Sequence, residues 1–226
     1  MKPKKMNRPL DASIFVESLD FKISEFQNIL TKIVECYKLM ISDGIKVKND
    51  ENQIRDLLHR NYLDNNEIRN RLGLTDYRFI PEVPETNTTG RTDIRIETIN
   101  TFLDTSAYYI IECKRLDNKN PTGKTGLNSK YIANGIMRFV EGKYSTYRDL
   151  NGMIGFVVET MDIKKNVHNI NNLLNKKPFY AGTEKDLSFQ SFIKDFKYQY
   201  CSIHRDLNDN VFKLYHLMFD FSENLV

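Results

Sequence analysis

Cysteine and histidine are scarce in this chain, and neither is spaced as a metal site requires. The four histidines show no spacing typical of metal ligands. The cysteines are an odd number and form no Cys-x-x-Cys pair, which argues against a disulfide framework and a thiolate zinc site; they are Cys36, Cys113 and Cys201. We therefore expect neither a structural zinc site nor a disulfide-stabilised fold.

Long apolar runs are also absent. No segment approaches the roughly 20 apolar residues that a membrane-spanning helix needs, and the basic N-terminus lacks the apolar stretch of a signal peptide. Hydrophobic residues make up 40% of the chain, aromatic residues 12% and charged residues 28%, as in ordinary soluble domains. This composition excludes a disordered chain or a fibre, and we expect a cytoplasmic protein without membrane contact.

The net charge is small, but basic residues are concentrated locally. The formal net charge is +3, and the N-terminal tail alone supplies four positive charges from Lys2, Lys4, Lys5 and Arg8. From Lys114 to Lys143, seven basic residues accompany only two acidic ones. Such a local excess suits contact with a polyanion. A solvated surface segment is the other interpretation.

Helical patterns dominate the first third of the chain. Apolar residues recur at helical spacing over Ser13–Ser42, and Asp43-Gly44 supplies a stop. A second helix is expected after Asn49-Asp50, with a further helical turn over Asn65–Arg71. We expect residues 1–49 to form a basic tail and helical lead, through which a second copy or a partner subunit could bind, and residues 50–226 to form one compact domain.

Strand patterns follow, with helices between them. Tyr77–Val83, Thr92–Ile99, Ala107–Ile111 and Met153–Val158 have strand character, Asn87–Gly90 has turn chemistry, and Lys130–Val140 and Asp162–Leu174 have helical character. Phe196–Ile203 and Val211–Phe219 flank Asn208-Asp209-Asn210 and predict a C-terminal β-hairpin. The predicted fold class is α/β, with a mixed central β-sheet flanked by helices.

Charged residues come directly after the most apolar of these strands. Glu112 and Lys114 should lie on one face, with Cys113 on the other, because strand side chains alternate. A short connection favours an antiparallel neighbour, which would bring Asp93 beside Glu112. Two adjacent carboxylates repel unless a proton or metal separates them, and Mg²⁺ is commonly held by one or two carboxylates. Simple pairing of Glu112 with Lys114 is the alternative.

These residues resemble the core of the PD-(D/E)XK nuclease superfamily. Asp93 precedes Glu112-Cys113-Lys114 by eighteen intervening residues, and the order of helices and strands from Asp50 to Glu159 is similar. The resemblance implies a restriction endonuclease-like core, Mg²⁺ or Mn²⁺ held by Asp93, Glu112 and the Cys113 carbonyl, and a Lys114 that orients the attacking water. Glu51 matches an acidic residue on the preceding helix, or is simply a first-turn glutamate. The chain departs from the pattern at Thr92, where proline is usual.

The following helix offers candidate substrate contacts. Arg138, Lys143 and Tyr144 would lie within reach of a phosphate backbone, and Tyr131 could stack on a base or form a hydrogen bond. Contacts of lysine and arginine with phosphates would give salt-sensitive binding with little sequence selectivity. Core packing of Tyr131 and a solvated Lys143 are the alternatives.

The expected function is metal-dependent hydrolysis of phosphodiester bonds in DNA, as an endonuclease of restriction, defence or mobile-element type. RNA is not excluded as the substrate. A nuclease-like binding or scaffolding subunit without catalysis is the alternative. A P-loop-like NTPase is a less favoured alternative: Pro121–Thr125 resembles the end of a P-loop, and Glu159 after the Met153–Val158 strand could mimic the acidic strand of an NTPase. The first glycine position of the P-loop is Asn118, however, and we expect the loop to continue well past Thr125.

Overall fold

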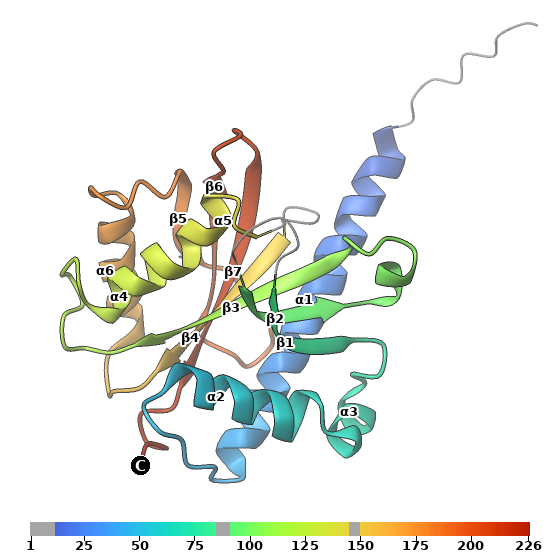
Figure 1. The fold of residues 1–226 in the computed structure, drawn as a ribbon, viewed down its shortest axis with the longest axis horizontal. Coiled ribbons are helices and arrows are strands. Elements are labelled where there is room, and N and C mark those ends of the chain that lie inside the picture. The colour runs from blue at the N-terminus through green and yellow to red at the C-terminus, as the bar shows by residue number, and fades with distance from the viewer. Residues whose placement is uncertain (1–11, 85–90, 145–149) are drawn as a thin grey trace, which may run out of the picture.

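A seven-stranded mixed sheet between two layers of helices forms the body of the protein (Figure 1). The computed structural model describes the backbone of residues 12–84, 91–144 and 150–226, and side chains from residue 20 onward. The helices are α1 (Ala12–Ser42), α2 (Glu51–Leu58), α3 (Asn66–Leu72), α4 (Leu127–Tyr131), α5 (Met137–Val140) and α6 (Ile163–Leu174). The strands are β1 (Arg78–Pro84), β2 (Arg91–Glu97), β3 (Tyr108–Leu116), β4 (Leu150–Val157), β5 (Thr183–Phe189), β6 (Gln199–Arg205) and β7 (Val211–Asp220).

The strand order in the sheet is β1-β2-β3-β4-β7-β6-β5. β1, β2 and β3 form an antiparallel meander, and β4 lies parallel to β3 after a helical crossover. β7 runs parallel to β4, while β6 and β5 complete the sheet in antiparallel fashion. The mixed α/β class is therefore confirmed, and the predicted C-terminal hairpin contributes strand β7 to the middle of the sheet.

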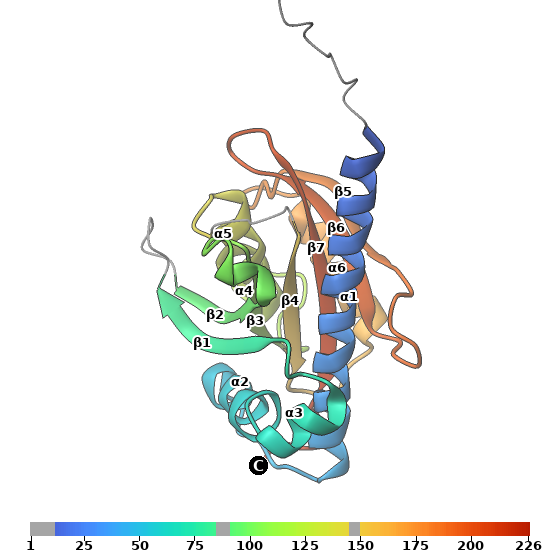
Figure 2. The same ribbon diagram turned by 90° about the vertical axis from the view of Figure 1, so that its right-hand side faces the viewer.

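Two apolar cores lie on opposite faces of the sheet. Figure 2 shows α1 on one side of the strands and α4 and α5 on the other. The first core joins α1, α2 and the sheet, and the second joins the sheet to the α4–α6 side. At most 1% of the surface of these α1 residues is exposed: Phe26, Ile29, Leu30, Ile33, Val34, Cys36 and Met40. This stretch of α1 is part of the domain core, so its apolar face is not available to a partner; the basic tail lies outside the described residues.

Several elements differ in extent from the sequence expectation. β3 does not end at Ile111 but continues to Leu116, because β4 pairs with it along that whole stretch. The helix expected from Lys130 begins at Leu127 and contains a π-helical turn, Ile132–Ile136, between α4 and α5. Strand β5 was not expected at all, and the turn predicted over Asn87–Gly90 lies outside the described residues.

Helix α2 is held in position by contacts at both of its ends. Asp50 caps the helix by accepting a 2.8 Å hydrogen bond from Gln53 N, as its sequence position predicts. Just before it, Val47 N donates to Asn224 O at 2.9 Å, which attaches the C-terminal residues to the loop. At the other end of the helix, His59 Nε2 lies 2.9 Å from Phe79 O of β1. α2 is thus held across the sheet edge at both of its ends.

A chain of hydrogen bonds with a single direction runs through the second core. His204 Nδ1 lies 2.9 Å from Ala181 O, so this nitrogen carries the proton and Nε2 accepts from Ser202 Oγ at 2.7 Å. Ser202 Oγ then accepts from His216 Nε2 at 2.7 Å, and His216 Nδ1 accepts from Tyr131 at 2.8 Å. Every member is buried, and in this arrangement of donors and acceptors both imidazoles are neutral.

We expect this series of buried hydrogen bonds to make folding sensitive to acid. Burial lowers the pKa of His204 to about 4, and burial also holds the pKa of His216 well below its usual value. Histidine in the unfolded state has a pKa of about 6.5, so below that pH the unfolded state binds protons that the folded state does not bind. Stability that is present at pH 7 is therefore lost on acidification. For His204 alone, this amounts to about 2 kcal/mol between pH 7 and pH 5.

Urea unfolding of His204→Gln and wild type measures this effect. The wild-type advantage in free energy of unfolding should shrink by about 2 kcal/mol from pH 7 to pH 5. The same comparison with His168→Gln, at an exposed position on α6, should be independent of pH. A pH-independent difference for His204→Gln would contradict the prediction.

No helix in the described part of the chain has both the length and the apolar character that crossing a bilayer requires.

Candidate functional site

The candidate site lies where β2 separates from β3. The paired register between these strands ends at Ile94 and Ile111, and Asp93 is the next residue of β2. Its carboxylate takes the place of the missing strand partner: Asp93 Oδ2 accepts a 2.7 Å hydrogen bond from Cys113 N. Asp93 and Glu112 therefore lie beside each other on one face, as expected, although the opening arises in mid-β3 and not at the end of that strand.

Glu51 fills the next position along the freed edge of β3. It is the first residue of α2, and its Oε2 accepts a hydrogen bond from Arg115 N at 3.0 Å. Two carboxylates thus satisfy backbone groups of β3 that β2 no longer pairs with. Of the two interpretations of Glu51, the structure favours a side chain turned toward the site, and the residue also occupies the first turn of the helix.

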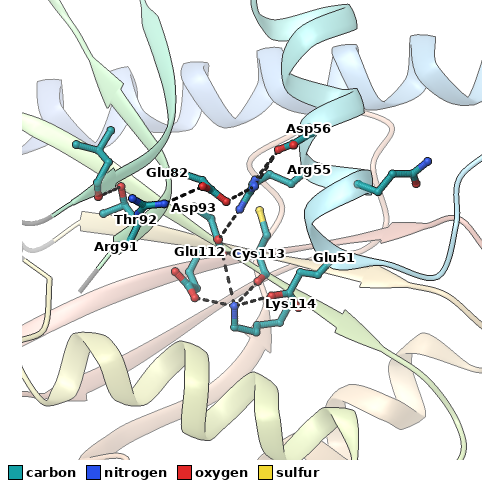
Figure 3. Close-up of polar contacts among 12 residues, drawn as sticks. Glu51, Arg55, Asp56, Glu82, Arg91, Thr92, Asp93, Glu112, Cys113 and Lys114 are labelled. Carbon is teal, nitrogen blue, oxygen red and sulfur yellow. Dashed lines mark hydrogen bonds and ion pairs between the residues drawn. The ribbon is translucent and has the colours of Figure 1, made fainter. Parts of the chain in front are cut away.

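The Lys114 ammonium lies at the centre of the site (Figure 3). Its Nζ is 2.7 Å from Glu112 Oε1, 3.0 Å from Glu51 Oε1 and 3.5 Å from Asp93 Oδ2. It also donates to the Cys113 carbonyl at 2.6 Å. The Glu112 side chain is completely buried and that of Lys114 is 8% exposed. Four oxygen ligands from three elements therefore converge on a single buried cation.

Burial and charge shift the protonation of both central groups. Burial raises the pKa of the Glu112 carboxyl to about 7, and the Asp93 charge acts in the same direction, against Lys114 and Arg138. Burial alone would favour the neutral amine of Lys114, but Glu112, Asp93 and Glu51 outweigh it and raise the pKa of this lysine above its usual value. The ammonium is consequently the favoured form of Lys114.

The second oxygen of Glu112 is held from the opposite side. Tyr144 OH donates to Glu112 Oε2 at 2.5 Å and accepts from Arg138 Nη1 at 2.5 Å. Arg138 Nη1 also lies 3.2 Å from Glu112 Oε1. Burial, together with the Glu112 charge, raises the pKa of Tyr144, so the hydroxyl keeps its proton. Both residues were predicted as substrate contacts, and in this structure they orient Glu112.

Arg55 connects Asp93 to a second group of charges. Its side chain is 3% exposed, and Nη1 donates to Asp93 Oδ1 at 3.1 Å. Nη2 contacts Glu82 Oε1 at 2.7 Å and Asp56 Oδ1 at 2.8 Å. Glu82 lies on β1 with a φ of 53°, in the left-handed region, where a non-glycine residue is strained.

The sequence pattern does not identify Arg55, Asp56 or Glu82 as site residues. Arg55 follows Glu51 by four residues and so shares its helix face, which is the one signal that could have found it. The strained backbone at Glu82 has no counterpart in the sequence pattern.

The other two predicted substrate contacts lie apart from the carboxylates. Tyr131 is fully buried in the second core, where its hydroxyl bonds His216, so core packing is the interpretation that fits. Lys143 is half exposed and pairs with Glu141 at 2.6 Å. Neither contacts Asp93, Glu112 or Lys114 in this structure.

The P-loop-like segment has its own set of contacts. α4 begins at Leu127, so the loop does not continue well past Thr125, and that part of the expectation is wrong. The loop is closed by bonds within itself, such as Asn128 Nδ2 to Pro121 O at 2.8 Å, and the Lys124 side chain is exposed. Glu159, two residues after the end of β4, accepts from Asn118 N at 2.9 Å and thereby holds the loop.

The donor set suits a hard divalent cation. Carboxylate and carbonyl oxygens are the ligands that Mg²⁺ and Mn²⁺ prefer, and Asp93, Glu112 and the Cys113 carbonyl already gather around one positive charge. Within the described ranges, no three side chains of His, Cys, Asp or Glu form a cluster that could hold a metal by themselves. A cation here would therefore use the carbonyl and take oxygens that now contact Lys114.

No family model, curated protein or solved structure matched the chain when it was compared with them. The resemblance to the PD-(D/E)XK nucleases thus depends on the residues of the site and the order of the elements that carry them.

Proposed function

We propose that this chain is a divalent-metal-dependent nuclease that hydrolyses phosphodiester bonds in DNA, as an endonuclease. The observation that carries the proposal is the convergence of Asp93, Glu112 and the Cys113 carbonyl on the Lys114 ammonium. One positive charge already sits among these oxygens, and the arrangement resembles the site implied by the sequence motif. The order of elements agrees with that resemblance: a helix with Glu51, an antiparallel meander, a helical crossover and a parallel strand.

In the proposed reaction, the residues of the chain have separate tasks. Asp93, Glu112 and the Cys113 carbonyl would hold Mg²⁺ or Mn²⁺, which when bound supplies positive charge to the scissile phosphate and acidity to a water. Lys114 donates hydrogen bonds to a phosphate oxygen or to the attacking water. Tyr144 and Arg138 hold the Glu112 carboxylate, and Arg55 holds Asp93, so that both acids keep their orientation during attack.

A cleavage assay tests the proposal. Supercoiled plasmid, linear duplex, single-stranded DNA and RNA are incubated with the protein and Mg²⁺ or Mn²⁺, with EDTA as the blank. We expect wild-type cleavage of DNA and a loss of about 100-fold or more in Glu112→Gln and Asp93→Asn, because each substitution removes an anionic ligand from the metal. Analysis of early products distinguishes internal cuts from cuts at ends.

The matched control is Glu97→Gln. Glu97 lies on the same strand and face as Asp93 but forms a 2.9 Å ion pair with Arg95, away from the site. Its activity should stay within about twofold of wild type, because the side chain is only partly exposed and contacts none of the site residues. Cleavage that persists in both Glu112→Gln and Asp93→Asn would contradict the site. Metal binding without cleavage of any nucleic acid would favour the non-catalytic binding subunit.

A further inference from the structure

A small basic pocket adjoins the carboxylate cluster. It measures about 270 Å³ and is lined by Asp50, Glu51, Asn52, Lys114, Arg115, Leu127, Lys130, Asn134 and Arg138. Lys114 and Glu51 connect it to the cluster, but neither Asp93 nor Glu112 lines it. The pocket therefore lies beside the position where the proposed metal would act, and not at that position.

The charges that line this pocket favour an anion. Four of its side chains are cationic, and the two acidic ones already have partners: Asp50 caps α2, and Glu51 bonds Lys114 and Arg115 N. Lys130 and Asn134 are exposed on one helical segment, four residues apart, so they face the pocket together. No hydrogen bond or ion pair of Lys130 side-chain atoms occurs among the residues that the structure describes.

Arg115 is a cation of the pocket lining whose guanidinium is held in place by the protein. Its Nη1 donates to Asn49 O and to Asn49 Oδ1, both at 2.6 Å, which fixes one end of the guanidinium. Its Nε is buried and has no hydrogen-bond partner within the described residues. A buried donor without a partner is costly and requires an explanation. Arginine N–H groups bind phosphate oxygens well, and Arg115 is one of the cations that line the pocket.

The size of the pocket limits what the anion can be. It is smaller than the roughly 300–1,000 Å³ typical of pockets that enclose a drug-sized ligand. A single phosphate group fits such a space. An anion of this kind within a chain of nucleotides is a backbone phosphodiester.

We infer that this pocket binds the backbone phosphate next to the scissile one, through Lys130, Asn134 and Arg115. The inference rests on the proposed function, and it adds residues that no part of the sequence motif identifies. A phosphate held here fixes the register of the strand with respect to Lys114 and carries no base information. Binding through this pocket should therefore be salt-dependent and similar for different sequences.

The test measures binding in EDTA, where the proposed cleavage cannot occur. Fluorescence anisotropy with a labelled duplex compares wild type with Lys130→Ala, Asn134→Ala and Arg115→Lys, the last of which keeps the charge but loses the guanidinium. We expect Lys130→Ala to weaken binding about five- to tenfold and to lower the slope of log K against log salt by about 1. The matched control is Lys176→Ala, an exposed lysine after α6 that does not line the pocket, with unchanged binding.

Two further probes distinguish the backbone from free phosphate. Inorganic phosphate and a deoxynucleoside monophosphate are titrated as competitors of the duplex. Weak competition by both, with Lys130-dependent duplex binding, supports the inference. Duplex binding that is equal in wild type, Lys130→Ala and Arg115→Lys overturns it, even if the wild type cleaves DNA. Absence of cleavage with Lys130-dependent binding would overturn the proposed function and leave the phosphate pocket standing.

Discussion

Replacement of Arg55 by methionine is expected to destabilise the fold by about 3–5 kcal/mol. The guanidinium is 3% exposed and contacts Asp93, Asp56 and Glu82. Methionine retains most of the side-chain volume but leaves these carboxylates without their shared cation. Removal of one partner from a buried ion pair is strongly destabilising because the remaining charge stays desolvated, and this applies chiefly to Asp93, whose side chain is 13% exposed. The three acids help to keep the pKa of Arg55 raised, so the cation is present at any ordinary pH.

Denaturant unfolding at neutral pH measures this prediction, with Arg60→Met as its control. Arg60 contacts the same Asp56, at 3.4 Å, but is 75% exposed, and we expect a change within about 0.5 kcal/mol because exposed ion pairs contribute little. If Arg55→Met and Arg60→Met have equal free energies of unfolding, the charge cluster does not stabilise the fold.

The pairing at the centre of the site could be predicted from the sequence because it depends on local rules. A short connection between two strands favours antiparallel neighbours, and alternation along a strand places Glu112 and Lys114 on one face. These rules place Asp93 next to Glu112, and in the structure both carboxylates contact the Lys114 ammonium. The same rules ended β3 too early, since charged residues interrupt the apolar pattern while β4 continues to pair.

The surrounding residues could not be predicted because their positions depend on tertiary packing. Arg55 reaches Asp93 only because α2 is held across the sheet edge by the C-terminal residues and by His59. Tyr144 contacts Glu112 from a segment after α5 that has no periodic pattern. Strand β5 was missed since its residues Glu184, Lys185 and Asp186 are exposed at an edge and give no apolar signal.

The Lys114 ammonium and a divalent cation in the site would compete for the same oxygens. Replacement by methionine removes the cation from among Glu51, Asp93 and Glu112, and Arg138 remains the nearest positive charge to Glu112. In EDTA, we expect Lys114→Met to lose about 3–5 kcal/mol of stability, because the buried carboxylates must then repel one another or take up protons. The loss should grow as pH rises above about 7, because Glu112 ionises there in the wild type, where Lys114 lowers its pKa, but keeps its proton to higher pH once that lysine is removed.

Added Mg²⁺ should reverse part of this loss, because a divalent ion can take the place of the missing ammonium. A tenfold tighter binding of Mg²⁺ by Lys114→Met than by wild type would appear as about 1.4 kcal/mol of extra stabilisation at a saturating concentration. Unfolding curves in EDTA and in a Mg²⁺ series measure both effects, with Lys143→Met as the control. Lys143 pairs with Glu141 at 2.6 Å but is half exposed, so its loss should change neither stability nor the response to Mg²⁺ appreciably. Equal Mg²⁺ responses in wild type and Lys114→Met would mean that ammonium and metal do not share these oxygens, and the proposed ligand set would have to be abandoned.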